Sequence, residues 1–188
     1  MESSTTTLII IVAVALLVVG VIVLFVVRRQ NSHRLRSRFG AEYDRIVEEQ
    51  GDTRKAESEL RERQKRVSRL EIAPLTPSAR DGFITRWREI QAEFVDEPKT
   101  ALNNADSLLS DVMRARGYPV EDFDQRSADL SVDHPVVVQN YRAGHDIALR
   151  HKRGEADTED LRRAMLNYRT LFDELVGEVA DTDKRQAS

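Results

Sequence analysis

The stretch "LIIIVAVALLVVGVIVLFVV", residues 8–27, decides the fold because it contains no charged side chain. A helix of this length rises about 30 Å, which matches the thickness of the hydrocarbon core of a bilayer. Leu, Ile, Val and Phe each favour insertion by roughly 0.3–0.6 kcal/mol near the centre of a membrane helix. The stretch therefore predicts a transmembrane helix whose insertion is favourable by several kcal/mol.

The flanking sequence argues against a cleaved export signal. Residues 1–7, "MESSTTT", lack the basic residues of a signal peptide, and residues 25–30, "FVVRRQ", lack a small-residue cleavage site. The core helix of a soluble protein normally keeps one polar face, which residues 8–27 do not have. The sequence thus favours an uncleaved membrane span.

Basic residues follow the span at once, and none precedes it. Residues 28–38 contain no acid and five arginines, which are Arg28, Arg29, Arg34, Arg36 and Arg38. Because basic flanks favour the cytoplasmic side, we expect residues 1–7 outside and residues 28–188 inside the cell. The five arginines are also candidate contacts for anionic lipid headgroups, although a topology signal alone explains them as well.

The composition of the rest of the chain favours helices and excludes several kinds of site. The 188 residues include 8 glycines and 5 prolines, and β-branched runs are rare beyond the span. The chain has no cysteine, which excludes disulfides, thiol nucleophiles and cysteine-based metal sites. The chain beyond residue 38 is more acidic than the net charge of −3 suggests, so we expect no nucleic-acid partner.

Residues 39–72 are expected to form a charged helical arm close to the membrane. Apolar residues from Phe39 to Val47 follow helical spacing, Gly51 ends this helix, and Asp52 caps the next one. The second helix has a thin apolar stripe and three i,i+4 pairs, Glu57–Arg61, Glu59–Arg63 and Glu62–Arg66. This pattern is typical either of a solvated spacer helix or of one side of a short coiled coil. In the second case the chain would form a homo-oligomer through the arm.

Residues 75–178 are expected to form a compact helical bundle, followed by a disordered tail at residues 179–188. Thr76 before Pro77 is the pattern of a helix start. Apolar residues recur at helical spacing, with Phe83, Trp87, Ile90, Phe94, Leu102, Leu109, Tyr141, Tyr168 and Phe172 among them. The expected fold class is all-α, with one N-terminal transmembrane helix, a charged membrane-proximal helical arm and a compact helical bundle.

Two further helix starts follow from polar residues ahead of apolar stripes. Asp133 is expected to cap the helix that contains Tyr141, and Thr158 is expected to cap the last helix.

The sequence contains no recognised catalytic, nucleotide-binding or metal-binding motif, so we expect no cofactor. His145 lies on an apolar stripe beside Tyr141, where a buried histidine bonded to a tyrosine or carboxylate is the ordinary explanation. The alternative is an enzyme with a helical active site formed by His145, Tyr141 and a carboxylate such as Asp146 or Asp133.

Two Tyr-Arg pairs, Tyr141-Arg142 and Tyr168-Arg169, are candidates for a surface that binds a protein partner. The other interpretation is that each tyrosine is half-buried and each arginine is solvated.

Residues 36–67, "RSRFGAEYDRIVEEQGDTRKAESELRERQKRV", and residues 112–142, "VMRARGYPVEDFDQRSADLSVDHPVVVQNYR", resemble a family of uncharacterised bacterial proteins. Members of that family look like small single-span proteins with a helical cytoplasmic part, and the resemblance covers most of residues 36–176. It implies a bacterial plasma-membrane location but no activity. The expected function is a non-enzymatic, single-pass membrane-anchored cytoplasmic module that docks a protein partner.

Overall fold

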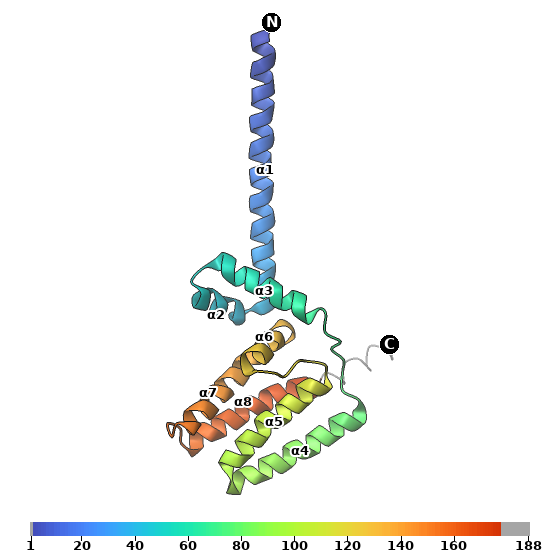
Figure 1. The fold of residues 1–188 in the computed structure, drawn as a ribbon, viewed down its shortest axis with the longest axis vertical. Coiled ribbons are helices and arrows are strands. Elements are labelled where there is room, and N and C mark those ends of the chain that lie inside the picture. Colours follow the sequence, from blue (N-terminus) through green and yellow to red (C-terminus); the bar gives the residue numbers. More distant parts are fainter. Residues whose placement is uncertain (1, 178–188) are drawn as a thin grey trace. The chain divides into compact units, whose positions relative to one another are not determined.

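A computed structural model describes the backbone of residues 2–177 and the side chains of residues 16–177 (Figure 1). The helices are α1 Glu2–Phe39, α2 Ala41–Gln50, α3 Thr53–Val67, α4 Pro77–Asp96, α5 Pro98–Ala115, α6 Phe123–Asp133, α7 Val138–Lys152 and α8 Thr158–Gly177. No strand occurs within residues 2–177, which confirms the all-α fold class. The predicted tail at residues 179–188 lies outside the described residues. The chain divides into two compact units, Met1–Glu57 and Ser58–Ser188.

In the first unit, α1 does not end where the apolar residues end. It continues through the whole basic segment 28–38 to Phe39, so the span and its arginines belong to one unbroken helix. Gly40 (φ 53°) separates α1 from α2, and Gly51 (φ 63°) ends α2 in the left-handed conformation, as its position predicts.

The carboxylate of Asp52 accepts hydrogen bonds from the backbone N–H groups of Arg54 (2.7 Å) and Lys55 (3.0 Å) at the start of α3. This confirms Asp52 as the N-cap. The boundary between the compact units falls inside α3, after Glu57, and not in the segment between α3 and α4. The reason is that the second half of α3 is tied to α6, since Arg66 pairs with the buried Asp129 at 2.6 Å.

The second unit contains the bundle (Figure 1). Helix α4 packs against α5, α5 packs against α8, and α8 packs against α7, while α6 contacts α7. The connection from α4 to α5 is short, and so is the connection from α7 to α8. The two helices of each pair therefore run antiparallel.

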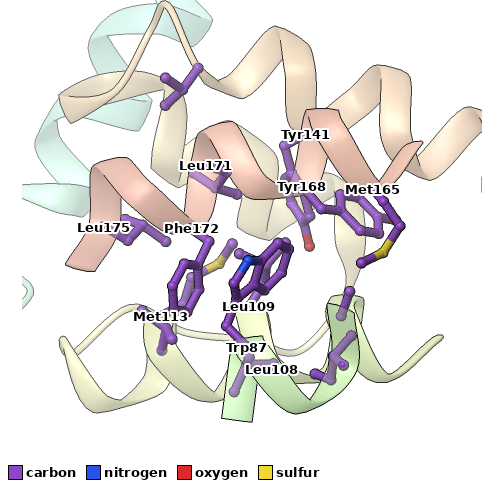
Figure 2. Packing of buried hydrophobic residues seen from close by; sticks show 14 of the residues in the cluster. Trp87, Leu108, Leu109, Met113, Tyr141, Met165, Tyr168, Leu171, Phe172 and Leu175 are labelled. Carbon is purple, nitrogen blue, oxygen red and sulfur yellow. The ribbon is translucent and has the colours of Figure 1, made fainter. Parts of the chain in front are cut away.

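The core of this unit lies between α8 and the pair α4 and α5. Figure 2 shows Tyr168, Leu171 and Phe172 of α8 together with Trp87 and the leucines of α5. The rings of Trp87 and Phe172 stack with their centroids 4.7 Å apart. Trp87, the only tryptophan of the sequence, is therefore a core residue.

The predicted helix starts have different outcomes. Thr76 caps α4 by accepting a hydrogen bond from the backbone N–H of Ala79 (3.3 Å), as expected. The expectation for Asp133 is wrong, because α6 extends to this residue and its carboxylate accepts a hydrogen bond from the Tyr118 hydroxyl (2.9 Å). The expectation for Thr158 is displaced by one residue, since the carboxylate of Asp157 accepts the backbone N–H of Asp160 (2.8 Å).

Candidate functional site

The apolar part of α1 is exposed on every side. Each Leu, Ile, Val and Phe from Leu16 to Val27 is 45–68% exposed, and every residue from Leu16 to Gln30 is exposed. Within residues 16–177, this is the one helix that is long and apolar enough to cross a membrane. A soluble surface rarely exposes an apolar area of this extent, because water contact with it is unfavourable.

The candidate lipid contacts of residues 28–38 are all exposed, and they share the helix axis of the span. They are Arg28, Arg29, Arg34, Arg36 and Arg38. Arg36 also pairs with Asp44 at 3.0 Å, and its guanidinium lies 5.9 Å from the centroid of the Tyr43 ring. Both members of this ion pair are largely solvated, so the pair contributes little to stability.

The start of α3 is attached to α1 just beyond the apolar segment. Glu57 accepts hydrogen bonds from the Ser32 hydroxyl and from the Tyr43 hydroxyl, the second at 3.1 Å. Nearby in α2, the buried carboxylate of Glu42 accepts two bonds of 3.0 Å from the guanidinium of Arg45. These charge-assisted bonds compensate for the burial of Glu42, which is fully removed from solvent.

The candidate partner surface of Tyr141, Arg142, Tyr168 and Arg169 does not exist as a single exposed patch. Both tyrosines are 0% exposed, and their ring centroids lie 5.9 Å apart in the bundle interior. The tyrosines are therefore core residues, more buried than either interpretation of the sequence supposed. Arg169 is exposed beside Asp173 (3.4 Å), and Arg142 is partly buried.

Gly144 explains how Tyr168 reaches its position. A Cβ atom at residue 144 would lie 2.6 Å from the Cε1 atom of Tyr168, so the tyrosine ring occupies the space that any larger residue would need. This mid-helix glycine therefore permits the close packing of α7 against α8.

A polar cluster lies around Tyr141. The Tyr141 hydroxyl donates to the carboxylate of Asp106 over 3.4 Å, and the guanidinium of Arg126 contacts the Ser110 hydroxyl and lies 4.0 Å from Asp106. Burial raises the pKa of Tyr141 and of Tyr168 far above the ordinary value, and the Asp106 carboxylate adds to the rise. Both hydroxyls therefore stay protonated, and the Tyr141 hydroxyl donates its proton to the bond with Asp106.

His145 is only partly buried, and its ring stacks on Phe123 with centroids 3.6 Å apart and an angle of 8°. Burial lowers the pKa of His145, although the Asp106 carboxylate opposes the shift. The proposed catalytic group is not assembled as expected, since Asp146 is exposed and Asp133 is bonded to Tyr118.

The carboxylate near Tyr141 is Asp106, which the sequence reasoning missed. A signal was available, because Asp106 shares helical spacing with Leu102, Leu109 and Met113 on the apolar face of α5. An acid on an apolar stripe points to a polar partner from another helix.

The remaining surface offers little for a ligand. Among residues 16–177, no group of three or more His, Asp or Glu side chains could hold a metal ion. An open groove of about 460 Å³ runs between α4 and α5, lined by Arg86, Glu89, Ile90, Glu93, Asn104 and Ser107. Most of its polar side chains bond to neighbours, as Asn104 does to Glu93 (2.8 Å) and Arg86 does to Asp111 (2.9 Å).

Comparisons with protein-family models, with curated proteins and with solved structures find no match to this chain.

Proposed function

We propose that this chain is a single-pass protein of the bacterial plasma membrane, with a non-catalytic cytoplasmic helical domain that docks a protein partner. The N-terminus would lie outside the cell and the helical domain inside. Membership of the single-span bacterial family that residues 36–67 and 112–142 resemble is part of this proposal.

The observation that carries the proposal is the exposure of the apolar part of α1. Between Leu16 and Val27 no neighbouring element covers the large apolar side chains, whereas a bilayer would cover all of them. The arginines that begin at Arg28 continue the same helix into the headgroup layer, which supports an orientation with the bundle on the cytoplasmic side.

Two features support docking rather than catalysis. The residues of the catalytic alternative are dispersed or enclosed, because Tyr141 is fully buried and the His145 ring is stacked on Phe123. The bundle instead provides a rigid core with a charged, exposed outer surface, which suits an anchored binding module.

Fractionation of cells that produce the full chain with a C-terminal tag tests the membrane part of the proposal. The chain should remain in the membrane pellet after alkaline carbonate extraction. Its tag should resist protease added to intact spheroplasts and become sensitive after permeabilisation. Release of the chain by carbonate, or digestion of the tag in sealed spheroplasts, would refute the proposed anchoring or orientation.

Crosslinking in intact cells tests the docking part. A residue-specific photocrosslinker at exposed positions of the bundle, for example Arg88 or Arg169, should join the chain to one recurrent protein, and that protein should retrieve the chain in the reciprocal experiment. If every position yields only a diffuse set of abundant proteins, the docking function is contradicted.

The catalytic alternative predicts a different result at His145. If His145 were catalytic, His145→Gln would abolish the biological effect of the chain while leaving the folded domain and its crosslinked partner unchanged. Under the docking proposal, the same variant retains its partner and its biological effect.

A further inference from the structure

The last part of α1 is strongly basic. Residues 28–38 continue the helix of the apolar segment without a break, and they contain no acid. Their five arginines are all exposed. Because one helix carries both the apolar segment and these arginines, the distance of each arginine from the apolar segment along the helix axis is fixed.

Three of the five arginines are recorded in no ion pair with the side chains of residues 16–177. They are Arg28, Arg29 and Arg34, which we call the exit arginines. All three belong to the compact unit Met1–Glu57, so their place on α1 does not depend on the bundle. Their charges are therefore open to an anion from outside the chain.

The acids of the same unit that contact α1 are bonded elsewhere. Asp44 pairs with Arg36 at 3.0 Å, and Glu57 accepts a hydrogen bond from the Ser32 hydroxyl. Neither carboxylate is within ion-pair distance of an exit arginine. These acids reduce the positive charge of residues 28–38 as a whole, but they do not occupy the exit arginines.

The exit arginines lie at the depth of the lipid headgroups when α1 spans a bilayer. Arg28 and Arg29 directly follow Val27, and Arg34 is seven residues beyond it, or about 10.5 Å along the axis. The headgroup layer is about 5–8 Å thick on each side of the hydrocarbon core. Side chains of a helix lean toward its N-terminus, so the long side chain of Arg34 extends back toward this layer.

The exit arginines also point to different sides of α1. At 3.6 residues per turn, Arg29 is rotated by about 100° and Arg34 by about 240° from Arg28. A single protein or nucleic-acid partner would reach only one side of the helix. Lipid headgroups, in contrast, surround it at this depth.

We propose that the exit arginines bind the headgroups of anionic phospholipids and so enrich these lipids around the end of the span. This inference rests on the proposed membrane anchoring and adds a lipid partner to it. A guanidinium donates two parallel hydrogen bonds to a phosphate, which suits the phosphodiester of a headgroup. Each Lys or Arg near an anionic surface contributes about 1 kcal/mol, which is roughly a fivefold increase in binding.

Lipid binding is separate from the orientation that the same arginines favour. An orientation signal acts while the chain enters the membrane, whereas lipid binding persists in the inserted protein. In a nanodisc both leaflets have the same composition, so the orientation of the chain does not decide which lipids surround α1. Nanodiscs therefore isolate the lipid contact.

Fluorescence quenching of the full chain in nanodiscs tests the inference, and the absence of cysteine allows single labels. One variant carries a fluorophore at Val27→Cys, next to the exit arginines, and a second carries it at Leu8→Cys, at the other end of the apolar segment, where no basic residue occurs. The discs contain phosphatidylcholine and phosphatidylglycerol, and an equal small fraction of either lipid carries a nitroxide quencher near the glycerol end of one acyl chain.

We expect the phosphatidylglycerol quencher to be enriched about fivefold over the phosphatidylcholine quencher around Val27→Cys, the effect of at least one arginine. The two quenchers should act equally at Leu8→Cys. Salt at about 1 M, where the Debye length is about 3 Å, should reduce the enrichment at Val27→Cys.

Three triple variants in the Val27→Cys background separate the exit arginines from general charge. Arg28→Gln/Arg29→Gln/Arg34→Gln should abolish the enrichment, and Arg28→Lys/Arg29→Lys/Arg34→Lys should retain most of it, because the charge is kept. The matched control Arg88→Gln/Lys99→Gln/Lys152→Gln removes three cations from exposed positions of the bundle and should leave the enrichment unchanged.

Equal quenching by the two lipids at Val27→Cys would overturn the inference. So would an equal enrichment at Leu8→Cys, or an enrichment that the glutamine variant of the exit arginines retains or that the bundle control also loses. Absence of quenching by either lipid would show that α1 does not enter the bilayer. That result would refute the anchoring, so the two failures are distinguishable.

Discussion

Helices α1 and α8 contain similar apolar residues but distribute them differently. In α8, the apolar side chains recur at intervals of three and four residues, and those from Leu161 to Val176 that face the core are buried. From Leu16 to Val27 in α1, they occupy consecutive positions and point in all directions. A helix with a single apolar stripe can bury that stripe in a protein core. A helix that is apolar on all sides needs an apolar surrounding, such as the interior of a lipid bilayer.

The largest expected effect comes from charging the apolar surface of α1. Two central aspartates, Leu17→Asp and Val18→Asp, should cost about 5–7 kcal/mol of insertion free energy, which is comparable with the whole driving force. The double variant should therefore leave the membrane pellet during carbonate extraction, while Leu17→Ile/Val18→Ile should stay. Full membrane retention of the aspartate variant would show that α1 is not held by lipid.

A smaller effect is expected from the core side of α8. Leu171 is fully buried, so Leu171→Ala should lower the free energy of unfolding by about 2–5 kcal/mol, measured by urea denaturation of the full chain in detergent. Leu166 on the same helix is 49% exposed, and Leu166→Ala should change the unfolding free energy by less than about 0.5 kcal/mol. Equal losses at the two positions would contradict the assignment of the core face.

Two glycines of the bundle, Gly144 and Gly82, should respond to replacement by alanine with opposite changes in stability. Gly144→Ala should destabilise the domain by about 1–3 kcal/mol, because the new Cβ meets the buried ring of Tyr168 at 2.6 Å. Gly82→Ala in α4 has nothing within 4 Å of the new Cβ and should stabilise the domain by about 0.5–1 kcal/mol. Thermal unfolding of both variants checks the prediction, which fails if the two changes have the same sign.

The smallest expected effect concerns His145. Because burial lowers the pKa of His145 below its ordinary value of 6.5, the unfolded state binds the proton more readily than the folded state. Stability is therefore unaffected by this group above pH 6.5 and falls as the pH drops from 6.5 toward the folded-state pKa. Over this pH range, the free energy of unfolding of His145→Gln should fall less than that of the native chain, measured by urea titration at each pH. Identical pH profiles for the two proteins would contradict the lowered pKa of His145.

The local features of the fold could be predicted from the sequence, since they depend on neighbouring residues. The cap at Thr76, the glycine stop at Gly51 and the core position of Trp87 follow from patterns within one or two helical turns. The end of α6 at Asp133 could not, because its bond to Tyr118 joins residues 15 positions apart and competes with capping.

The candidate sites were harder to predict because they depend on packing between helices. Tyr141 meets Asp106 from α5, and His145 meets Phe123 from α6. Local spacing places Asp106 on an apolar stripe, but it does not say which residue of another helix meets Asp106 or His145. The Tyr-Arg pairs depend on helix packing in the same way. The apolar stripes predict that Tyr141 and Tyr168 lie on helices, but they do not predict that the bundle buries both side chains completely. The exposed apolar surface of α1, by contrast, requires no partner helix and was evident from composition alone.

Labelling of single cysteines in living cells tests the central claim most directly, since the natural chain contains no cysteine. Two variants are needed, with Ser3→Cys ahead of the apolar segment and Thr170→Cys on α8. A membrane-impermeant maleimide should modify Ser3→Cys in intact spheroplasts and should modify Thr170→Cys only after lysis. Labelling of Thr170→Cys in sealed spheroplasts, or of neither site before lysis, would contradict a spanning α1 with the helical domain inside the cell.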